Sequence, residues 1–557
     1  ILLAKSAEFK VSYLLDNNIS LSFKLNEYDV IENNGLSKVV LDNDREYSKS
    51  SEQYSKLIHI DSDYSISTLN ESVVSYDASQ NNNLNSSTSD YLSIKEHIFR
   101  GRKLLQISVD PIKYNSESNK INVLESVNIN IDIEGNLNLE NSISKKSRTF
   151  DNLLNNLVLN PLNDRQEDYQ RPSVLYISDP DVMGSPYLQA LINWRKQQGY
   201  EVYLVSTNET GNSTTSIKNY ITEAYYNWDN PPEYLCFIGD ANGSVSVPTY
   251  DVTGGGGGWN SAHGESDYPY TLIEGDDLFP EMIVGRISVR SSTELATVVQ
   301  KIIGYEKLYA GDDGWLSTTA LVGDPYDSGI STVITNQYIE QIMENYGVEE
   351  INTQYSGSNF DSFMREQINS GISYLNYRGF YGFSNFNTND VNQLNNGYKL
   401  PFISTLTCGV NSFSDDSESV VEALLRAGSV ASPAGAVAVV GTSQSYTHTA
   451  FNNIVSMGIF EGIYTYEAET AGLALIYGKI ALMNAYPQNP NDNVYLFASW
   501  NNLMGDPLTH LWTKSPKVLD NFHLQAVAQS SDYFDVVVND QEGRPVSNAT
   551  VTLYKND

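Results

Sequence analysis

The chain has 557 residues, and its 34 lysines and arginines against 68 aspartates and glutamates give a formal net charge of −34 at pH 7. This length exceeds what a single hydrophobic core organises, so several domains are expected. The negative charge repels phosphate backbones and argues against nucleic acid as a partner. Two cysteines are too few for a disulfide framework, and no apolar run is long enough to span a bilayer.

Residues 1–150 alternate apolar and polar side chains over short runs, among them FKVSYLL, ISLSFKL and INVLESVNINIDIEG. A period of two is typical of strands with one buried face, so this region is predicted to be a β-rich domain. The first residues lack the basic start and the small-residue cleavage site of a signal peptide, so an export signal is expected to lie upstream or to have been removed. Residues 151–170 are predicted to form a linker.

The periodicity changes at Arg171. Strand-like and helix-like segments then alternate, which predicts βαβ units with right-handed crossovers and a parallel sheet. We expect two α/β subdomains, at 171–310 and 311–516, joined by a helix at 294–308. The strands of the second subdomain are predicted at 316–323, 348–352, 371–377, 400–407 and 436–441.

The strand predicted at 400–407 runs into Cys408, which polar and glycine residues follow. Ligands and chemistry in parallel sheets lie at the carboxyl ends of strands, and the polar surroundings predict an exposed sulfur. An exposed cysteine with a base nearby is a candidate nucleophile, whereas a cysteine packed in a core is inert; the residue pattern leaves both open. Cys236 lies inside the apolar run 234–239 and is predicted to be a core residue.

Several segments in this order resemble the gingipain-type cysteine peptidases, a family with a caspase-like α/β fold. They are YLCFIGDA (234–241), YPYTLIEGDDLFPEMIVGRISV (268–289), LNYRG (375–379), LPFISTLTC (400–408), EALLRAG (422–428), GAVAVVGTSQ (435–444) and MGDPLTHLWT (504–513). The resemblance covers roughly residues 170–515, and residues 91–133 resemble the prodomain that precedes such domains. It implies that Cys408 is the nucleophile, that proteins or peptides are substrates and that no cofactor is required. It also implies an extracellular or bacterial cell-surface location, reached through type IX secretion.

The general base of this family is a histidine in a Gly-His-Gly turn, whereas this chain reads Gly-Phe-Tyr at 379–381, with Phe380 at the base position. Phenylalanine can neither take the thiol proton nor protonate a leaving amine. His448 and His263 are the candidate substitutes. The loops that carry them should leave the same sheet edge as Cys408 if the strands are parallel.

The resemblance also places Glu281 at the position of the acidic residue that orients the histidine. Without that histidine, Glu281 is expected to pair with Arg286, Arg378 or a cation. Backbone N–H groups at Cys408 and in the 380–382 turn would form the oxyanion hole, which needs no particular side chain.

Two hypotheses of function remain open. In the first, the chain is a secreted cysteine endopeptidase module with Cys408 as nucleophile and an altered base. In the second, it is a catalytically degenerate structural or adhesive module of the cell surface that keeps the peptidase fold. Both expect a two-part α/β domain with parallel sheets, preceded by an all-β N-terminal domain.

An acidic cluster and a short C-terminal region complete the chain. Asp415, Asp416 and Glu418 follow Cys408 and, as hard oxygen ligands, would suit a structural Ca²⁺; an acidic loop without metal is the alternative. Residues 517–557 alternate and contain a Glu-Gly turn, which predicts the start of an immunoglobulin-like β-domain. Because a whole sandwich takes roughly 100 residues, further C-terminal domains or completion by a neighbouring chain are expected.

Overall fold

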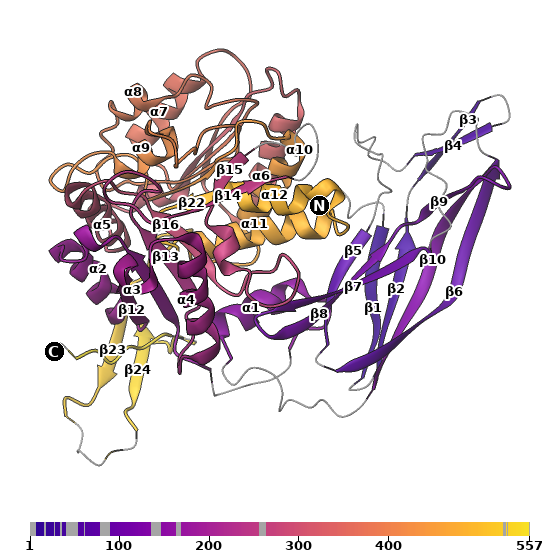
Figure 1. Cartoon of the computed structure of the whole chain (residues 1–557), viewed down its shortest axis with the longest axis horizontal. Coiled ribbons are helices and arrows are strands. Elements are labelled where there is room, and N and C mark those ends of the chain that lie inside the picture. The colour runs from indigo at the N-terminus through magenta and orange to yellow at the C-terminus, as the bar shows by residue number, and fades with distance from the viewer. Residues whose placement is uncertain are drawn as a thin grey trace. The chain divides into compact units, whose positions relative to one another are not determined.

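The computed structural model describes residues 7–15, 18–26, 28–33, 36–40, 54–60, 62–77, 90–134, 146–162, 169–254, 263–526, 531, 533–547 and 549–555 (Figure 1). These residues divide into two compact units. Unit 1 contains 1–170, 271–281 and 480–495, and unit 2 contains 171–270, 282–479 and 496–557. Among the described residues, no helix is both long and apolar enough to cross a bilayer.

Among its described residues, unit 1 contains three antiparallel sheets, of which two share one core. The alternation of apolar and polar side chains explains this core. In the strand at 18–25, every second residue is apolar and buried, namely Ile19, Leu21, Phe23 and Leu25. The first sheet has the order β1 (Ala7–Leu15), β2 (Asn18–Leu25), β10 (Lys120–Glu134), β6 (Asp63–Asp77), with β9 (Ile112–Asn115) paired to β10. The second has the order β5 (Tyr54–His59), β8 (Arg102–Val109), β7 (Leu92–Phe99), and β3 (Asp29–Asn33) pairs with β4 (Leu36–Val40).

The predicted linker is partly a helix, α1 (Arg148–Leu157). Ser147 caps its first turn, and Phe150, Leu153 and Leu154 are buried. Their spacing of three and four residues is that of an amphipathic helix, a period that the linker prediction missed. Residues 163–168 of the predicted linker lie outside the described residues.

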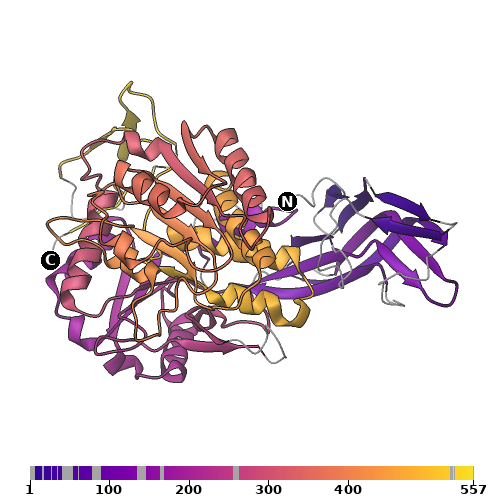
Figure 2. The same ribbon diagram turned by 90° about the horizontal axis from the view of Figure 1, so that it is seen from above.

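Unit 2 is built on one ten-stranded sheet (Figure 2). Its order is β12 (Glu201–Ser206), β11 (Ser173–Ser178), β13 (Tyr234–Ile238), β16 (Ile283–Ile287), β22 (Asn501–Met504), β21 (Ala438–Thr442), β20 (Phe402–Thr405), β19 (Tyr374–Arg378), β17 (Thr318–Gly323), β18 (Glu350–Gln354). Each half of five strands is parallel, but β21 and β22 pair antiparallel, so the two halves run in opposite directions. The parallel strands predicted for each of the two subdomains are found, whereas the antiparallel pairing that joins the halves into one sheet was not predicted. The strand β22 belongs to the first half although its residues fall in the predicted second subdomain.

Helices follow most strands of this sheet. Among them, α6 packs against β17 and β19 and against α10, and α9 packs against β21. The helices are α2 (Pro186–Gln197), α3 (Thr207–Thr210), α4 (Thr214–Asn227), α5 (Ser292–Glu306), α6 (Ser331–Tyr346), α7 (Phe360–Ser370), α8 (Thr388–Val391), α9 (Val420–Arg426), α10 (Thr449–Tyr464), α11 (Ala471–Ala485) and α12 (Asn493–Trp500). A hairpin of β14 (Tyr250–Thr253) and β15 (His263–Ser266) also belongs to unit 2.

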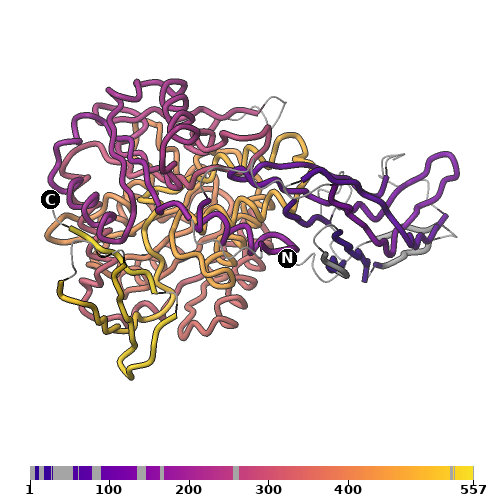
Figure 3. The backbone as a smooth tube through the Cα atoms, turned by 90° about the horizontal axis from the view of Figure 1, so that it is seen from below, coloured from indigo at the N-terminus to yellow at the C-terminus, as the bar shows by residue number. Residues whose placement is uncertain are grey.

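In the described part of the C-terminal region, which is yellow in Figure 3, β23 (Leu519–His523) pairs antiparallel with β24 (Val536–Asp540). The predicted Glu-Gly turn lies at 542–543, where the N–H of Gly543 donates to the carbonyl of Asp540. The immunoglobulin-like assignment of this pair stays a prediction.

Candidate active site

Cys408 lies just beyond the carboxyl end of β20, which β19 and β21 flank in parallel. A β-bridge joins it to Tyr381, and the N–H of Gly382 donates to the Cys408 carbonyl at 3.1 Å. The turn at 379–381, where the resemblance expects a histidine, therefore lies directly beside Cys408. The same hydrogen bond occupies the Gly382 N–H, which was expected to help form an oxyanion hole.

The sulfur of Cys408 is buried rather than exposed. The residue is 7% exposed, and its Sγ lies 3.0 Å from the hydroxyl oxygen of Thr447. The loop that follows β21 covers it, since the N–H of Gly409 donates to the carbonyl of Gln444 at 2.9 Å. The polar residues after Cys408 predicted an exposed sulfur. The prediction is wrong because the loop that covers the sulfur is distant in the sequence.

No imidazole bonds to this sulfur. The chain has six histidines, all of them within the described residues, and Cys408 takes its hydrogen-bond partner from Thr447 alone. The side chains of Phe380 and Tyr381 are 47% and 64% exposed. The turn where the resemblance expects the base thus carries two exposed aromatic side chains, and the phenyl ring of Phe380 has no proton to exchange.

His448 is the nearest histidine along the chain to the sulfur's partner, because it follows Thr447 directly. It is the N-cap of α10, and its Nδ1 accepts a hydrogen bond from the N–H of Ala450 at 3.1 Å. An accepting Nδ1 assigns the neutral ring with its proton on Nε2. In this arrangement the basic nitrogen of His448 is occupied by the helix.

We expect His448→Ala to lower the unfolding free energy by about 1 kcal/mol, because it removes a helix cap. His448→Asn should restore most of that loss, since asparagine is among the best capping residues. Urea denaturation followed by circular dichroism measures both. Equal destabilisation by the two substitutions would contradict the capping role.

His263 lies on the β14–β15 hairpin, with its ring 69% exposed and its Nδ1 3.0 Å from a carboxylate oxygen of Asp251. The premise that its loop shares a carboxyl edge with Cys408 is wrong, because β13 runs antiparallel to β20. The hairpin nevertheless reaches the Cys408 loop through Glu265. That carboxylate accepts from both the N–H and the hydroxyl of Ser414 at 3.0 Å.

Glu265 is a residue of this region that the sequence analysis missed. It is 8% exposed, and burial raises its pKa. Its carbonyl accepts from the hydroxyl of Ser443, the first residue after β21 and thus the start of the loop that covers the sulfur. Nothing in its local sequence distinguishes it from a surface glutamate, so only the three-dimensional contacts identify it.

Glu281 is fully buried, and its carboxylate accepts from the backbone N–H groups of Ile273 and Glu274 at 2.7 and 3.1 Å. Its other oxygen has no hydrogen-bond partner among the described residues. Burial raises the pKa of Glu281 to about 8. The expected pairing with Arg286 is not found, because Arg286 binds Asp267 through two nitrogens at 2.7 Å.

We expect Glu281→Gln to stabilise the protein increasingly as the pH rises. The folded-state pKa lies above the unfolded one, so the carboxyl group contributes stability when protonated and loses it between pH 4.5 and about 8. Glutamine can still accept from both amides and has no charge to bury. The melting temperature of the variant should match that of the wild type near pH 4 and exceed it by roughly 3 °C or more at pH 8. A constant difference across this range would contradict the buried-carboxyl explanation.

The calcium site expected at the acidic cluster stays a prediction. Within the described ranges, no three or more His, Cys, Asp or Glu side chains are grouped to hold an ion, and this includes Asp415, Asp416 and Glu418. Glu418 instead accepts from Arg290 and Arg426 at 2.9 and 3.1 Å. Two guanidinium groups thus balance the charge that was expected to attract Ca²⁺.

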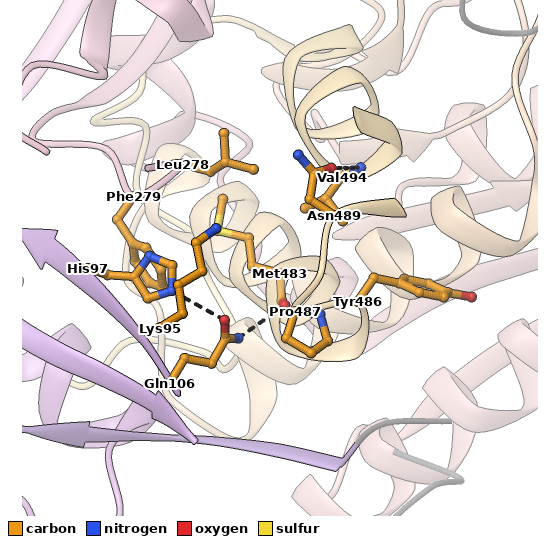
Figure 4. A pocket seen from close by; sticks show the side chains of 10 residues that line it. All are labelled: Lys95, His97, Gln106, Leu278, Phe279, Met483, Tyr486, Pro487, Asn489 and Val494. Atoms are coloured by element: carbon orange, nitrogen blue, oxygen red, sulfur yellow. Dashed lines mark hydrogen bonds between the residues drawn. The ribbon is translucent and has the colours of Figure 1, made fainter. Parts of the chain in front are cut away.

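Within unit 1, the structure forms a small cavity lined in part by His97, Gln106 and Phe279 (Figure 4). Gln106 accepts from or donates to the His97 ring at 3.2 Å and donates to the carbonyl of Met483 at 3.3 Å. The cavity has a volume of about 20 Å³, which is room for about one water molecule. It is too small for a peptide side chain or a cofactor.

The fold of this chain is shared with solved structures of cysteine proteinases. A structure of the Arg-specific cysteine proteinase gingipain R superposes with a TM-score of 0.58 and 21% identity, covering 68% of this chain and 86% of that one. The complex of pro- and mature domains of RgpB from Porphyromonas gingivalis matches with a TM-score of 0.57 and 22% identity, over 67% of this chain and 90% of that one.

The profile of peptidase family C25 matches residues 167–512, and the chain belongs to this family. Gingipain R2 of Porphyromonas gingivalis is 25% identical over 268 residues, which are 46% of this chain and 35% of that protein. Lys-gingipain of the same organism is 24% identical over 303 residues, 50% of this chain and 16% of that protein. The resemblance to gingipain-type peptidases is therefore confirmed, and the chain spans about a third or less of the length of these relatives.

Proposed function

We propose that the chain is a peptidase-fold module of the bacterial cell surface that binds polypeptides beside Cys408 without rapid hydrolysis of amide bonds. One observation carries this proposal. The resemblance places Phe380 at the base position, and no hydrogen bond joins a histidine to the Cys408 sulfur among the described residues. Hydrolysis of an amide needs a group that takes the thiol proton and returns it to the leaving amine.

Exposed aromatic side chains support the binding part of the proposal. Phe380 and Tyr381 adjoin Cys408, and Tyr446, which is 69% exposed, precedes Thr447. Aromatic residues are enriched in protein interfaces because they bury a large area at a low entropic cost. We define these three residues as the aromatic rim, and its chemistry suits an extended polypeptide with apolar side chains.

The remaining parts of the proposal rest on the family resemblance. They are export by type IX secretion, an extracellular or cell-surface location, a prodomain-like role for residues 1–150 and an immunoglobulin-like continuation from residues 517–557. The location is tested by separating the cells into fractions without added protease and detecting the protein in each fraction with an antibody against unit 2. Recovery of the protein in the cytoplasm alone would contradict it.

The experiment that tests binding and hydrolysis together uses an unbiased peptide library with mass-spectrometric readout. We expect saturable binding of apolar peptides and no cleavage products. Tyr381→Ser combined with Phe380→Ser should weaken binding by at least about fivefold, the equivalent of roughly 1 kcal/mol. Tyr226→Ser, which removes a 57% exposed tyrosine elsewhere in unit 2, is the matched control. Unchanged binding by the rim variant would overturn the proposal.

The second candidate is an active peptidase in which His448 is the base. The observation that favours it is the position of His448 next to Thr447, whose hydroxyl lies 3.0 Å from Sγ. A rearrangement that breaks the Ala450 cap would free its Nδ1 to act. Cleavage of library peptides that is lost in both Cys408→Ala and His448→Asn would select this candidate.

A further inference from the structure

Unit 1 contains an open groove between the two sheets that share its core. The groove has a volume of about 560 Å³, which falls within the range of roughly 300–1,000 Å³ that is usual for ligand sites. Its most buried side chains are Val109, Leu124 and Val127, and all three are apolar. The strands β6 and β7 supply further lining residues. The groove therefore has room for several side chains of a ligand.

The groove lies between the edges of the two sheets. Among the described residues, β6 pairs only with β10 and β7 pairs only with β8, so both are edge strands. Tyr64 of β6 donates a hydrogen bond to Glu96 of β7 at 2.7 Å, which joins the two edges at one end of the groove. Farther along the strands, Ile66 of β6 and Ile94 of β7 line the groove, and no described strand pairs with either edge there. The sandwich is thus open on this side.

The hydrogen bonds of β7 show which of its backbone groups face the open side. In an antiparallel pair, successive residues alternately bond to the neighbouring strand and point away from it. Ile98 points away from β8, because its N–H donates to the carboxylate of Asp277 at 2.7 Å. The register between β7 and β8 is regular along the whole strand. Leu92, Ile94 and Glu96 therefore also direct their N–H and C=O groups to the open side.

These three residues form an unpaired edge beside an apolar groove. No hydrogen bond between described residues uses their N–H or C=O groups on the open side. Their side chains face the groove, because Leu92 and Ile94 line it and Glu96 bonds to Tyr64. An unpaired edge is a template for another strand. Peptide recognition by strand addition combines backbone hydrogen bonds with pockets for alternate side chains, and this part of unit 1 supplies both.

A β-bulge in β6 brings a carboxylate into the groove. Two residues of β6, Asn70 and Glu71, stand opposite a single residue of β10, Val127. Asn70 has a φ of 55°, in the left-handed region. A bulge redirects the side chains next to it, and Glu71 lines the groove. Asp90, just before β7, is a second carboxylate of the lining.

The charge of the groove selects its occupant. The described lining contains Glu71 and Asp90 but no lysine, arginine or histidine, so it favours a cationic ligand. A second copy of this chain does not meet this requirement, because its net charge of −34 would repel the groove. A basic polypeptide does, and its backbone can also bond to the edge of β7.

We propose that the groove of unit 1 binds an extended polypeptide segment of a partner protein, apolar at alternate positions and basic at one end, which adds a strand to the free edge of β7. The alternate apolar side chains cover Leu124 and Val127, and the basic side chain pairs with Glu71 and Asp90. The added strand extends the sheet β5-β8-β7 over the open side of the core. This binding site is independent of the proposed function, which concerns unit 2.

The test measures binding of synthetic peptides to the full chain by fluorescence anisotropy. The probe is a fluorescein-labelled peptide of about eight residues, in which valine and threonine alternate and a lysine stands at each end. Two further peptides carry N-methyl groups on all valines or on all threonines. We expect saturable binding of the probe, and a loss of at least about tenfold for only one of the methylated peptides, because only every second amide faces β7. Equal affinities of the two methylated peptides would overturn strand addition and indicate a cavity for apolar small molecules.

Matched protein variants locate the binding site. Ile94→Lys adds a cation to the groove and should weaken binding at least about fivefold, whereas Leu69→Lys adds the same charge to β6 at a residue that is 51% exposed and does not line the groove. Equal affinities of these two variants would overturn the proposal. So would the absence of saturable binding to the wild type.

A second variant covers the case in which Ile94→Lys fails to fold. Glu71→Gln changes an exposed side chain and should weaken binding about threefold and reduce its dependence on salt. Unchanged affinity of this variant would contradict the charge pairing and overturn the proposal. Phe380→Ser combined with Tyr381→Ser should bind the probe as tightly as the wild type. Failure of peptide binding at the aromatic rim is thereby distinguished from failure at the groove.

Discussion

Phe380→His is expected to raise peptide hydrolysis by roughly 100-fold or more, the range that a positioned general base contributes. The substitution returns an imidazole to the turn that a β-bridge joins to Cys408. Phe380 is 47% exposed, so the smaller ring can be accommodated without leaving a core cavity. The measurement is kcat/KM on a fluorogenic peptide drawn from the library that the wild type binds.

Two control variants make this result specific. Phe380→Ala removes the aromatic ring without adding a base and should hydrolyse no faster than the wild type. Phe380→His combined with Cys408→Ala should lose the gain completely. If Phe380→His and Phe380→Ala are equally slow, the absence of the histidine does not explain the lack of hydrolysis, and the buried sulfur becomes the stronger explanation.

Asp267→Asn is expected to lower the unfolding free energy of unit 2 by about 3–5 kcal/mol, because it leaves a buried guanidinium ion without its charge partner. Arg286 is fully buried and bonds to Asp267 through Nε and Nη2, both at 2.7 Å. Its Nη1 also donates to the carbonyls of Gly239, Asp240 and Val247. Urea denaturation followed by tryptophan fluorescence measures the loss.

The matched control is Arg290→Gln, which breaks partly exposed pairs with Glu294 and Glu418 in the same unit and should cost less than about 1 kcal/mol. Asp267 follows β15 directly, so Asp267→Asn should also loosen the β14–β15 hairpin that carries Glu265. Comparable losses for the two variants would show that burial of Arg286 is not what makes its pairing important.

The sequence alone determined the order and type of most elements of unit 2. Apolar runs between turn residues predicted strands at 371–377, 400–407 and 436–441, and the structure has β19 at Tyr374–Arg378, β20 at Phe402–Thr405 and β21 at Ala438–Thr442. Such runs are local properties of the chain, because a strand buried on both faces needs apolar side chains throughout. The family resemblance, carried by short segments within these runs, was equally readable.

Only the tertiary structure decided the direction of the two half-sheets and the surroundings of the site. The strand β22 lies between β16 and β21 and pairs with residues more than 50 positions away in the sequence. Because it pairs parallel with β16 and antiparallel with β21, the two half-sheets run in opposite directions. The sequence around Cys408 is polar and predicted an open sulfur, yet the distant loop at 444–447 covers it. Arg378 is the last residue of β19, and it is buried and bonds to residues of α10. Periodicity records the chemistry of neighbouring residues, whereas burial and charge compensation depend on which distant segments fold against them.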